Sequence, residues 1–261
     1  MTFDRRTVLA GLATIPFAGL ARGGAARAQD SSAGALAGDR VATSAGEIVL
    51  HPVSHASLVI GFADQVVYVD PVGGAEAFAG LPAATAVLVT HGHGDHFDLP
   101  TLEAVAGGDV PLLVSGEVYE KLPAALKPKA QGVPNGESRE IAGITVDAVP
   151  AYNTTEERKQ YHPRGVGNGY VLNIGDKKIY VAGDTEDVPE MRALTGIEVA
   201  FLPMNLPYTM TEEQAADAVK AFRPRIVYPY HYRDSDPQKF ADLVGDAAEV
   251  RLVDWYAGGG H

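Results

Sequence analysis

The sequence predicts an α+β fold in which two β-sheets pack face to face and helices cover their outer faces. The first half of the chain opens with three short β-branched segments and then alternates strands with helices, and the second half repeats this plan. Two such halves favour two sheets, each covered by its own helices. No low-complexity segment or linker interrupts residues 45–261, which are therefore predicted to form a single domain.

The first half begins with a predicted meander of strands, because short β-branched runs are separated by turn residues such as Ala63 and Asp64. Strands and helices then alternate. The expected strands are 47–51, 57–62, 65–70, 85–91, 111–115 and 144–153, and the expected helices are 99–107 and 117–122.

The second half begins with a predicted hairpin that turns at Gly175 and Asp176. The helix that follows later has a capping box formed by Thr211 and Gln214. The expected strands are 169–175, 177–184, 199–203, 225–231 and 250–256, and the expected helix is 211–222.

The N-terminal segment 1–28 is predicted to be an export signal. It contains Arg5 and Arg6, a weakly apolar run too short to span a bilayer, and small residues ending in "ARA". This pattern resembles a twin-arginine signal, which predicts a periplasmic protein with a flexible leader at 29–44. The alternative is a first helix that anchors the chain in a membrane.

Composition limits the chemistry. The chain has no cysteine, so disulfides, thiolate metal ligands and a cysteine nucleophile are excluded. Removal of residues 1–28 changes the net charge from −12 to −15, since that segment contains four arginines and one aspartate. A surface this acidic repels phosphate backbones and anionic lipids, so we expect no nucleic-acid partner and no membrane partner once the signal is removed.

Potential metal ligands follow several predicted strands directly. The stretch "VTHGHGDHFD" contains the pattern H-x-H-x-D-H, in which His91 and His93 can point to one side of an extended segment. Gly92 and Gly94 are expected to leave room for a metal. Imidazole and carboxylate ligands suit zinc, iron or manganese, and two metals about 3.5–4 Å apart fit such a short loop. Asp184, His231 and Asn153 end three other strands.

These motifs, "THGHGDH", "AGDT" and "YPYHY", resemble the metallo-β-lactamase (MBL) superfamily, in its branch of metal-dependent hydrolases. The resemblance implies a four-layer αββα sandwich. It implies a first metal on His91 and His93, a second metal on Asp95, His96 and His231, and a bridging carboxylate, Asp184. A hydroxide between the metals would be the nucleophile, with Asp95 orienting it.

The chain departs from the family pattern at Asn153, where many members supply a further histidine to the first metal. Either Asn153 or His162 could complete the first site or contact the substrate, and His162 could instead donate a proton to the leaving group. The alternative for His162 is a surface-loop residue. We expect His55 and Asp70 to lie next to the metal ligands and orient them without binding the metal.

The resulting prediction is a hydrolase with two divalent metal ions, zinc first and manganese or iron as alternatives, that cleaves an ester, lactone, amide or phosphodiester of a small molecule. Asp95, His162 and Asp184 are the predicted catalytic residues. The competing hypotheses are a diiron redox enzyme of the same fold and a non-catalytic periplasmic metal-binding protein.

Overall fold

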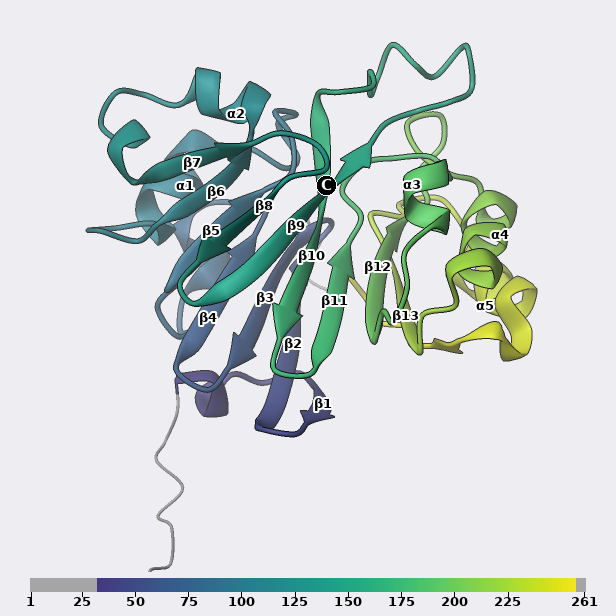
Figure 1. Ribbon diagram of the computed structural model, residues 1–261, viewed down its shortest axis with the longest axis horizontal. Helices are drawn as coiled ribbons and strands as arrows, with labels where there is room; N and C mark the ends of the chain where they lie inside the picture. The colour runs from purple at the N-terminus through teal and green to yellow at the C-terminus, as the bar shows by residue number, and fades with distance from the viewer. Residues whose placement is uncertain (1–31, 257–261) are drawn as a thin grey trace, which may run out of the picture.

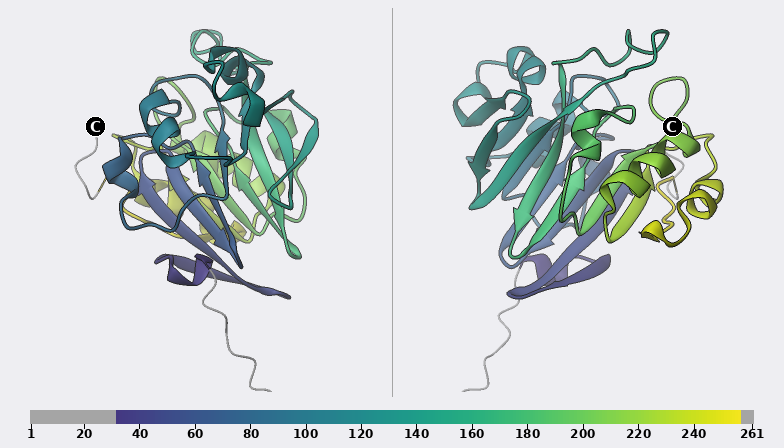
Figure 2. Two further views of the ribbon diagram at one scale, coloured as in Figure 1. Left: turned by 90° about the vertical axis from the view of Figure 1, so that its left-hand side faces the viewer. Right: turned by 45° about the vertical axis from the view of Figure 1, so that its right-hand side comes forward.

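The computed structural model describes residues 32–256, and it contains two seven-stranded sheets packed face to face. The first sheet has the order β1-β2-β3-β4-β5-β6-β7, and the second has the order β14-β13-β12-β11-β10-β9-β8. Figure 1 shows α1 and α2 beside the first sheet and α3, α4 and α5 beside the second, and Figure 2 shows the same layers from two other sides. The predicted αββα sandwich is confirmed. The predicted signal peptide, residues 1–28, lies outside the described residues.

The strands of the first sheet are β1 (Asp39–Thr43), β2 (Gly46–Ser54), β3 (Ser57–Phe62), β4 (Gln65–Val69), β5 (Ala86–Val89), β6 (Leu112–Ser115) and β7 (Ala130–Val133). The strands of the second sheet are β8 (Ser138–Ile141), β9 (Ile144–Ala151), β10 (Gly167–Ile174), β11 (Lys177–Val181), β12 (Val199–Pro203), β13 (Ile226–Tyr230) and β14 (Glu249–Val250). The helices are α1 (Leu99–Val105), α2 (Gly116–Lys121), α3 (Pro189–Arg192), α4 (Glu212–Phe222) and α5 (Pro237–Val244). Short 3₁₀ helices are η1 (Ser32–Ala35), η2 (Ala75–Phe78), η3 (Lys127–Lys129) and η4 (Gly245–Ala247).

Three apolar clusters hold these layers together. One fills the space between the sheets and includes Leu58, Phe201 and Trp255. The other two lie between each sheet and its helices, around Leu102 in the first half and Phe222 in the second. Burial of apolar surface on both faces of each sheet is the main stabilising term of such a sandwich.

The predicted hairpin and capping box are both present. Strands β10 and β11 pair antiparallel across the turn at Gly175 and Asp176. At the start of α4, the Thr211 hydroxyl accepts a hydrogen bond from the Gln214 amide at 3.1 Å, and the Gln214 side chain accepts one from the Thr211 amide at 3.0 Å. These bonds satisfy backbone donors that the first helical turn leaves unpaired.

Two predicted boundaries are wrong. The expected leader, 29–44, includes strand β1, which pairs with β2 along its whole length and buries Val41. At the other end, the expected strand 250–256 contributes only its first residue to β14. The chain leaves the sheet there because the Trp255 ring inserts into the core between the sheets.

The parallel strands place the candidate functional residues at one edge of each sheet. Strands β4, β5 and β6 run parallel in the first sheet, and β11, β12 and β13 run parallel in the second. Carboxyl ends of neighbouring parallel strands lie together, so the residues that follow them form adjacent loops. No helix within residues 32–256 is both long and apolar enough to cross a lipid bilayer.

Candidate metal centre

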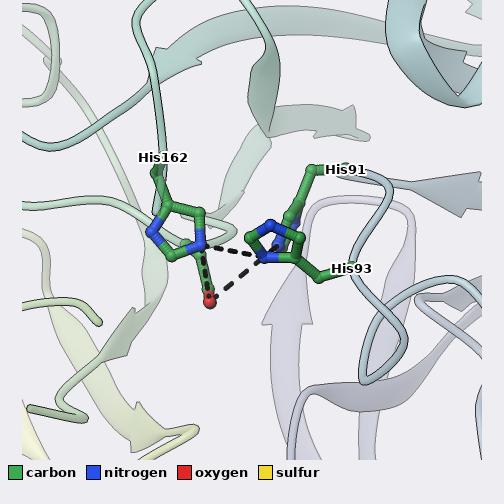
Figure 3. Close-up of side chains that lie close together, drawn as sticks. His91, His93 and His162 are labelled. Atoms are coloured by element: carbon green, nitrogen blue, oxygen red, sulfur yellow. Dashed lines mark hydrogen bonds and ion pairs between the residues drawn. The ribbon is translucent and has the colours of Figure 1, made fainter. Parts of the chain in front are cut away.

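The first ligand cluster contains three histidines and one carboxylate. His162 Nε2 lies 3.2 Å from His93 Nδ1 and 3.2 Å from Asp184 Oδ2. His91 Nε2 lies 3.1 Å from His93 Nδ1 and 3.9 Å from Asp184 Oδ2. In Figure 3 the rings of the three histidines converge on one another. A tetrahedral zinc ion with Zn–N distances of about 2.0–2.1 Å separates its ligands by about 3.4 Å, so these spacings fit one metal ion.

A second ligand cluster shares the Asp184 carboxylate with the first. His96 Nε2 is 3.2 Å from Asp184 Oδ1, and His231 Nε2 is 3.4 Å from Asp184 Oδ2. His231 Nε2 is also 3.3 Å from Asp95 Oδ2. The ligand atoms of His96, Asp184 and His231 all lie within 4.8 Å of one another. Asp184 therefore belongs to both clusters, and the structure brings all six ligands expected from the resemblance into one region.

Asp70, at the end of β4, fixes which ring nitrogen His96 can offer. Asp70 Oδ2 accepts hydrogen bonds from His96 Nδ1 at 2.8 Å and from the Thr90 hydroxyl at 2.7 Å. The Thr90 oxygen lies 3.0 Å from His91 Nδ1 and accepts a hydrogen bond from it. With both Nδ1 atoms donating, Nε2 is the ring nitrogen through which His91 and His96 can bind a metal. Asp70 thus orients His96 directly and His91 through the Thr90 hydroxyl.

Asn153 supports His162 through its backbone and its side chain. The Asn153 backbone amide donates to the His162 carbonyl at 2.9 Å, and its side-chain nitrogen donates to the Tyr208 carbonyl at 2.7 Å. His162 Nδ1 donates to that same carbonyl at 3.1 Å, which leaves Nε2 free. His162 is buried, so the surface-loop interpretation is wrong.

Glu186 holds the segment that carries His162, and sequence reasoning did not identify it. Its buried carboxylate accepts six hydrogen bonds, from the amide and hydroxyl of both Thr154 and Thr155, from Arg158 Nη1 at 2.7 Å and from Gln214 Nε2 at 3.5 Å. The available signal was its position directly after the "AGDT" motif. A buried carboxylate with this many donors acts as an anchor for the backbone around it.

His55, in the turn between β2 and β3, approaches the second cluster. Its Nε2 lies 3.2 Å from Asp95 Oδ2, and its ring centroid lies 3.8 Å from that of His231. The ligand atoms of His55, Asp95 and His231 lie within 4.8 Å of one another, so His55 is placed as a possible further ligand and not only as a support. His55, Asp70 and His231 all have positive φ angles of 46–50°. Such strained conformations concentrate at functional sites.

The charges of the two clusters favour cation binding. Burial, reinforced by His96, lowers the pKa of His91 well below its ordinary value, and burial, reinforced by His162, lowers the pKa of His93. Burial alone would raise the pKa of Asp184, but the nearby His231 and His96 hold it well below its usual range. Neutral imidazoles beside an ionised carboxylate are the protonation states that bind a divalent metal.

His96 differs from the other histidines. Burial opposes a charge on its ring, but Asp184 and Asp70 outweigh that effect and raise the pKa of His96 well above its ordinary value. A metal on His96 Nε2 therefore takes the place of a proton.

Two buried polar atoms without hydrogen-bond partners in residues 32–256 also favour a metal at this site. His96 Nε2 and Asp184 Oδ1 are buried and face each other, yet neither has a hydrogen-bond partner among the described residues. Unpaired buried polar atoms are costly, and a shared cation would satisfy both. The ligands are nitrogen and oxygen only, which suits zinc, manganese or iron.

Gly183, near the site, serves backbone packing. A Cβ at Gly183, whose φ is +63°, would lie 2.7 Å from the Asn168 carbonyl oxygen. The expectation that Gly92 and Gly94 leave room for a metal stays a prediction. A Cβ at Gly92 would meet the side chains of Glu117 and Lys121, and a Cβ at Gly94 would meet nothing within 4 Å.

A cavity of about 630 Å³ opens above the clusters. Its floor contains His93, Asp95, His162, Asp184 and His231. Its walls are formed by Tyr161, Asn205, Leu206, Pro207, Tyr208, Arg233 and Asp234. A larger cavity of about 700 Å³ lies beside β7 and contains none of the predicted ligands. The smaller cavity is therefore the candidate substrate site.

A sandwich of two sheets with this histidine loop and a shared carboxylate defines the metallo-β-lactamase class of metalloprotein. Residues 60–232 match the beta-lactamase superfamily domain, so the chain belongs to that superfamily, as the sequence motifs predicted. The relatives of this chain are named as hydrolases. It is 34% identical over 224 residues to a UPF0173 metal-dependent hydrolase of Pelotomaculum thermopropionicum, covering 77% of this chain and 94% of the relative.

Solved structures share the fold. A candidate metal-dependent hydrolase of Parabacteroides distasonis is 39% identical, with a TM-score of 0.77, and the match covers 83% of this chain and 97% of that one. A metallo hydrolase of Ignicoccus hospitalis is 25% identical, with a TM-score of 0.67, and the match covers 79% and 94%. Together with the ligand clusters, these similarities place the chain in a family of metal-dependent hydrolases.

Proposed function

We propose that this protein is a dinuclear hydrolase that cleaves an ester, lactone, amide or phosphodiester bond in a small molecule. The observation that carries the proposal is the Asp184 carboxylate, which lies near histidines of both clusters. Its Oδ1 is 3.2 Å from His96 Nε2, and its Oδ2 is 3.2 Å from His162 Nε2 and 3.4 Å from His231 Nε2. One carboxylate between two nitrogen-rich clusters is suited to bridge a pair of metal ions.

Each side chain has a separate role in this proposal. His91, His93 and His162 hold the first ion, His96, His231 and Asp95 hold the second, and Asp184 is shared. Bound divalent cations would supply Lewis acidity, lowering the pKa of the attacking water and polarising the scissile group. Zinc is the proposed metal, because it combines imidazole and carboxylate ligands without redox chemistry.

Asp95 is the carboxylate best placed to act on a substrate. Its side chain is 39% exposed and lines the cavity, whereas Asp184 is buried. Burial opposes ionisation of Asp95, but hydrogen bonds from His231 and His55 hold its pKa below the usual range. An ionised carboxylate at the cavity floor can orient water by accepting a hydrogen bond from it.

The test is elemental analysis of the chain from residue 29, purified without added metal, combined with an ester hydrolysis assay. We expect two zinc ions per chain. The variant Asp184→Asn should bind at most one and lose most activity, whereas the control Asp187→Asn, which removes only an ion pair with Arg192, should keep both. One metal per chain in the wild type would contradict the dinuclear assignment, and two iron ions would favour the redox alternative.

We also propose that the protein is exported to the periplasm by the twin-arginine route, on the strength of the N-terminal sequence alone. Replacing Arg5 and Arg6 together with lysine should leave the full-length chain in the cytoplasm. Cell fractionation measures this, and normal export of the double variant would refute the proposal.

A further inference from the structure

A tight turn beside the metal centre presents apolar side chains to solvent. In this turn the Asn205 amide donates to the Thr209 hydroxyl at 2.7 Å, and the Tyr208 amide donates to the Asn205 carbonyl at 2.8 Å. Leu206 is 47% exposed and Tyr208 is 44% exposed. Across the described part of the chain, these are two of the three exposed large apolar side chains. Exposed apolar groups gathered at a cavity mouth mark a binding surface.

This turn forms one wall of the cavity above the ligands. The Tyr161 ring meets the Tyr208 ring edge to face, with centroids 4.9 Å apart and an interplanar angle of 73°. Leu206 and Pro207 extend the same wall. Because the Tyr208 carbonyl also holds His162 Nδ1, the wall is fixed relative to the first ligand cluster. A rigid apolar wall at this place is suited to the non-reacting part of a substrate.

Arg233 lines the same cavity and comes two residues after the ligand His231. Its backbone has a φ of 37°, and its amide donates to the Tyr256 hydroxyl at 2.9 Å, so its position is well defined. Within residues 32–256, neither Arg233 nor its neighbour Asp234 has an ion-pair partner. Arg233 is exposed, so its guanidinium can pair with an anion that enters the cavity.

We propose that the substrate is a small organic carboxylate with an apolar or aromatic arm. The arm packs against Tyr161, Leu206 and Tyr208, the carboxylate pairs with Arg233, and the scissile bond lies over the metal ligands. Arginine binds carboxylates through two parallel hydrogen bonds, so this contact would fix orientation as well as charge. The proposal rests on the proposed hydrolase function and adds the substrate class to it.

The test compares two esters of equal acyl length, the mono(4-nitrophenyl) ester of glutaric acid and 4-nitrophenyl pentanoate, by release of 4-nitrophenol. With zinc-loaded protein, we expect kcat/KM to be at least about tenfold higher for the carboxylate ester. In Arg233→Met, this ratio should fall about tenfold. The control Lys178→Met removes the same charge from an exposed position on β11 and should leave the ratio unchanged.

A separate measurement tests the contact between the substrate arm and the apolar wall. Leu206→Ala should reduce the preference for the phenyl over the methyl monoester of glutaric acid about fivefold, because it removes only wall contact. Turnover of both 4-nitrophenyl esters with no charge preference, or with a preference that Arg233→Met leaves intact, would overturn the substrate proposal alone. Turnover of neither ester by protein carrying two metal ions would overturn this proposal, and lack of turnover of a lactone, an amide and a phosphodiester as well would overturn the proposed function.

Discussion

Replacing Glu186 with glutamine should loosen the segment that delivers His162 and should cost about 3 kcal/mol of folding stability. The carboxylate is fully buried and pairs with Arg158, whose side chain is 20% exposed. Breaking a buried ion pair costs about 3–5 kcal/mol, and the lower end applies because glutamine retains one acceptor and Arg158 keeps contacts to Thr209 and Gln214. The amides of Thr154 and Thr155 would also lose an ionised acceptor.

Two measurements separate loss of stability from loss of positioning. Urea unfolding of the metal-free protein gives the free energy of unfolding. Competition of the folded protein with a zinc chelator gives the affinity of each metal, and we expect the first metal, on His91, His93 and His162, to lose about tenfold to a hundredfold in affinity. The milder variant Thr155→Val removes one hydroxyl donor to Glu186 and should lower stability by about 1 kcal/mol.

The matched control is Glu198→Gln. Glu198 is another well-covered carboxylate in ion pairs, with Arg225 and Lys177, but it lies at the start of β12 away from the histidines. Its replacement should lower stability without changing zinc affinity. If Glu186→Gln binds both zinc ions as tightly as the wild type while losing stability, Glu186 supports the fold but does not position His162.

Three further predictions follow from the same contacts. Asp70→Asn should weaken zinc binding at the His96 site about tenfold to a hundredfold in a chelator competition, since the amide has one acceptor atom in place of the two carboxylate oxygens that accept from the Thr90 amide, the Thr90 hydroxyl and His96 Nδ1; unchanged affinity would contradict the orienting role. Gly183→Ala should lower the free energy of unfolding in urea by at least about 2 kcal/mol, whereas Gly196→Ala, at a φ of +68° with open space around it, should cost less. Removing zinc with a chelator should lower the melting temperature, because metal binds only the folded ligand set; an unchanged melting temperature would indicate that the purified protein held no metal.

Most of the fold could be predicted from the sequence because buried strands with β-branched runs have a strong local signal. The segment "TAVLVTH" predicts β5 and places His91 at its end, and the hairpin of β10 and β11 follows from the turn at Gly175. Strands β7 ("AQGV") and β8 ("SREI") were missed, since they are four residues long and only partly apolar. Pairing within the sheets, and not local propensity, makes these segments strands.

The helix α5 was also missed, although its start has a readable signal. Asp236 caps it by accepting from the Gln238 and Lys239 amides, and Pro237 occupies its first position. Its single apolar stripe is short, with Phe240 and Val244 as the buried residues. The packing of α5 against α4 completes a helix that its own sequence specifies weakly.

The metal ligands with fixed spacing could be identified from the sequence, but the completion of the first site could not. His91, His93, Asp95 and His96 lie within six residues, so the spacing itself shows that they can meet. The placement of His162 depends on contacts between distant segments, chiefly its bond to the Tyr208 carbonyl. Such tertiary contacts have no local signature in a single sequence.

The end of β11 explains how this chain can supply His162 to the first cluster without a histidine at the end of β9. Asp184 contributes a carboxylate to both clusters, and Glu186, two residues later, binds the backbone of the segment after Asn153. Asn153 in turn pairs with the His162 backbone, so the histidine that is absent from the strand end is supplied from an adjacent position. One strand end therefore holds the shared ligand and anchors the loop that completes the first site. Because the two tasks depend on residues so close in the chain, a change that moves this segment should weaken both metal sites together.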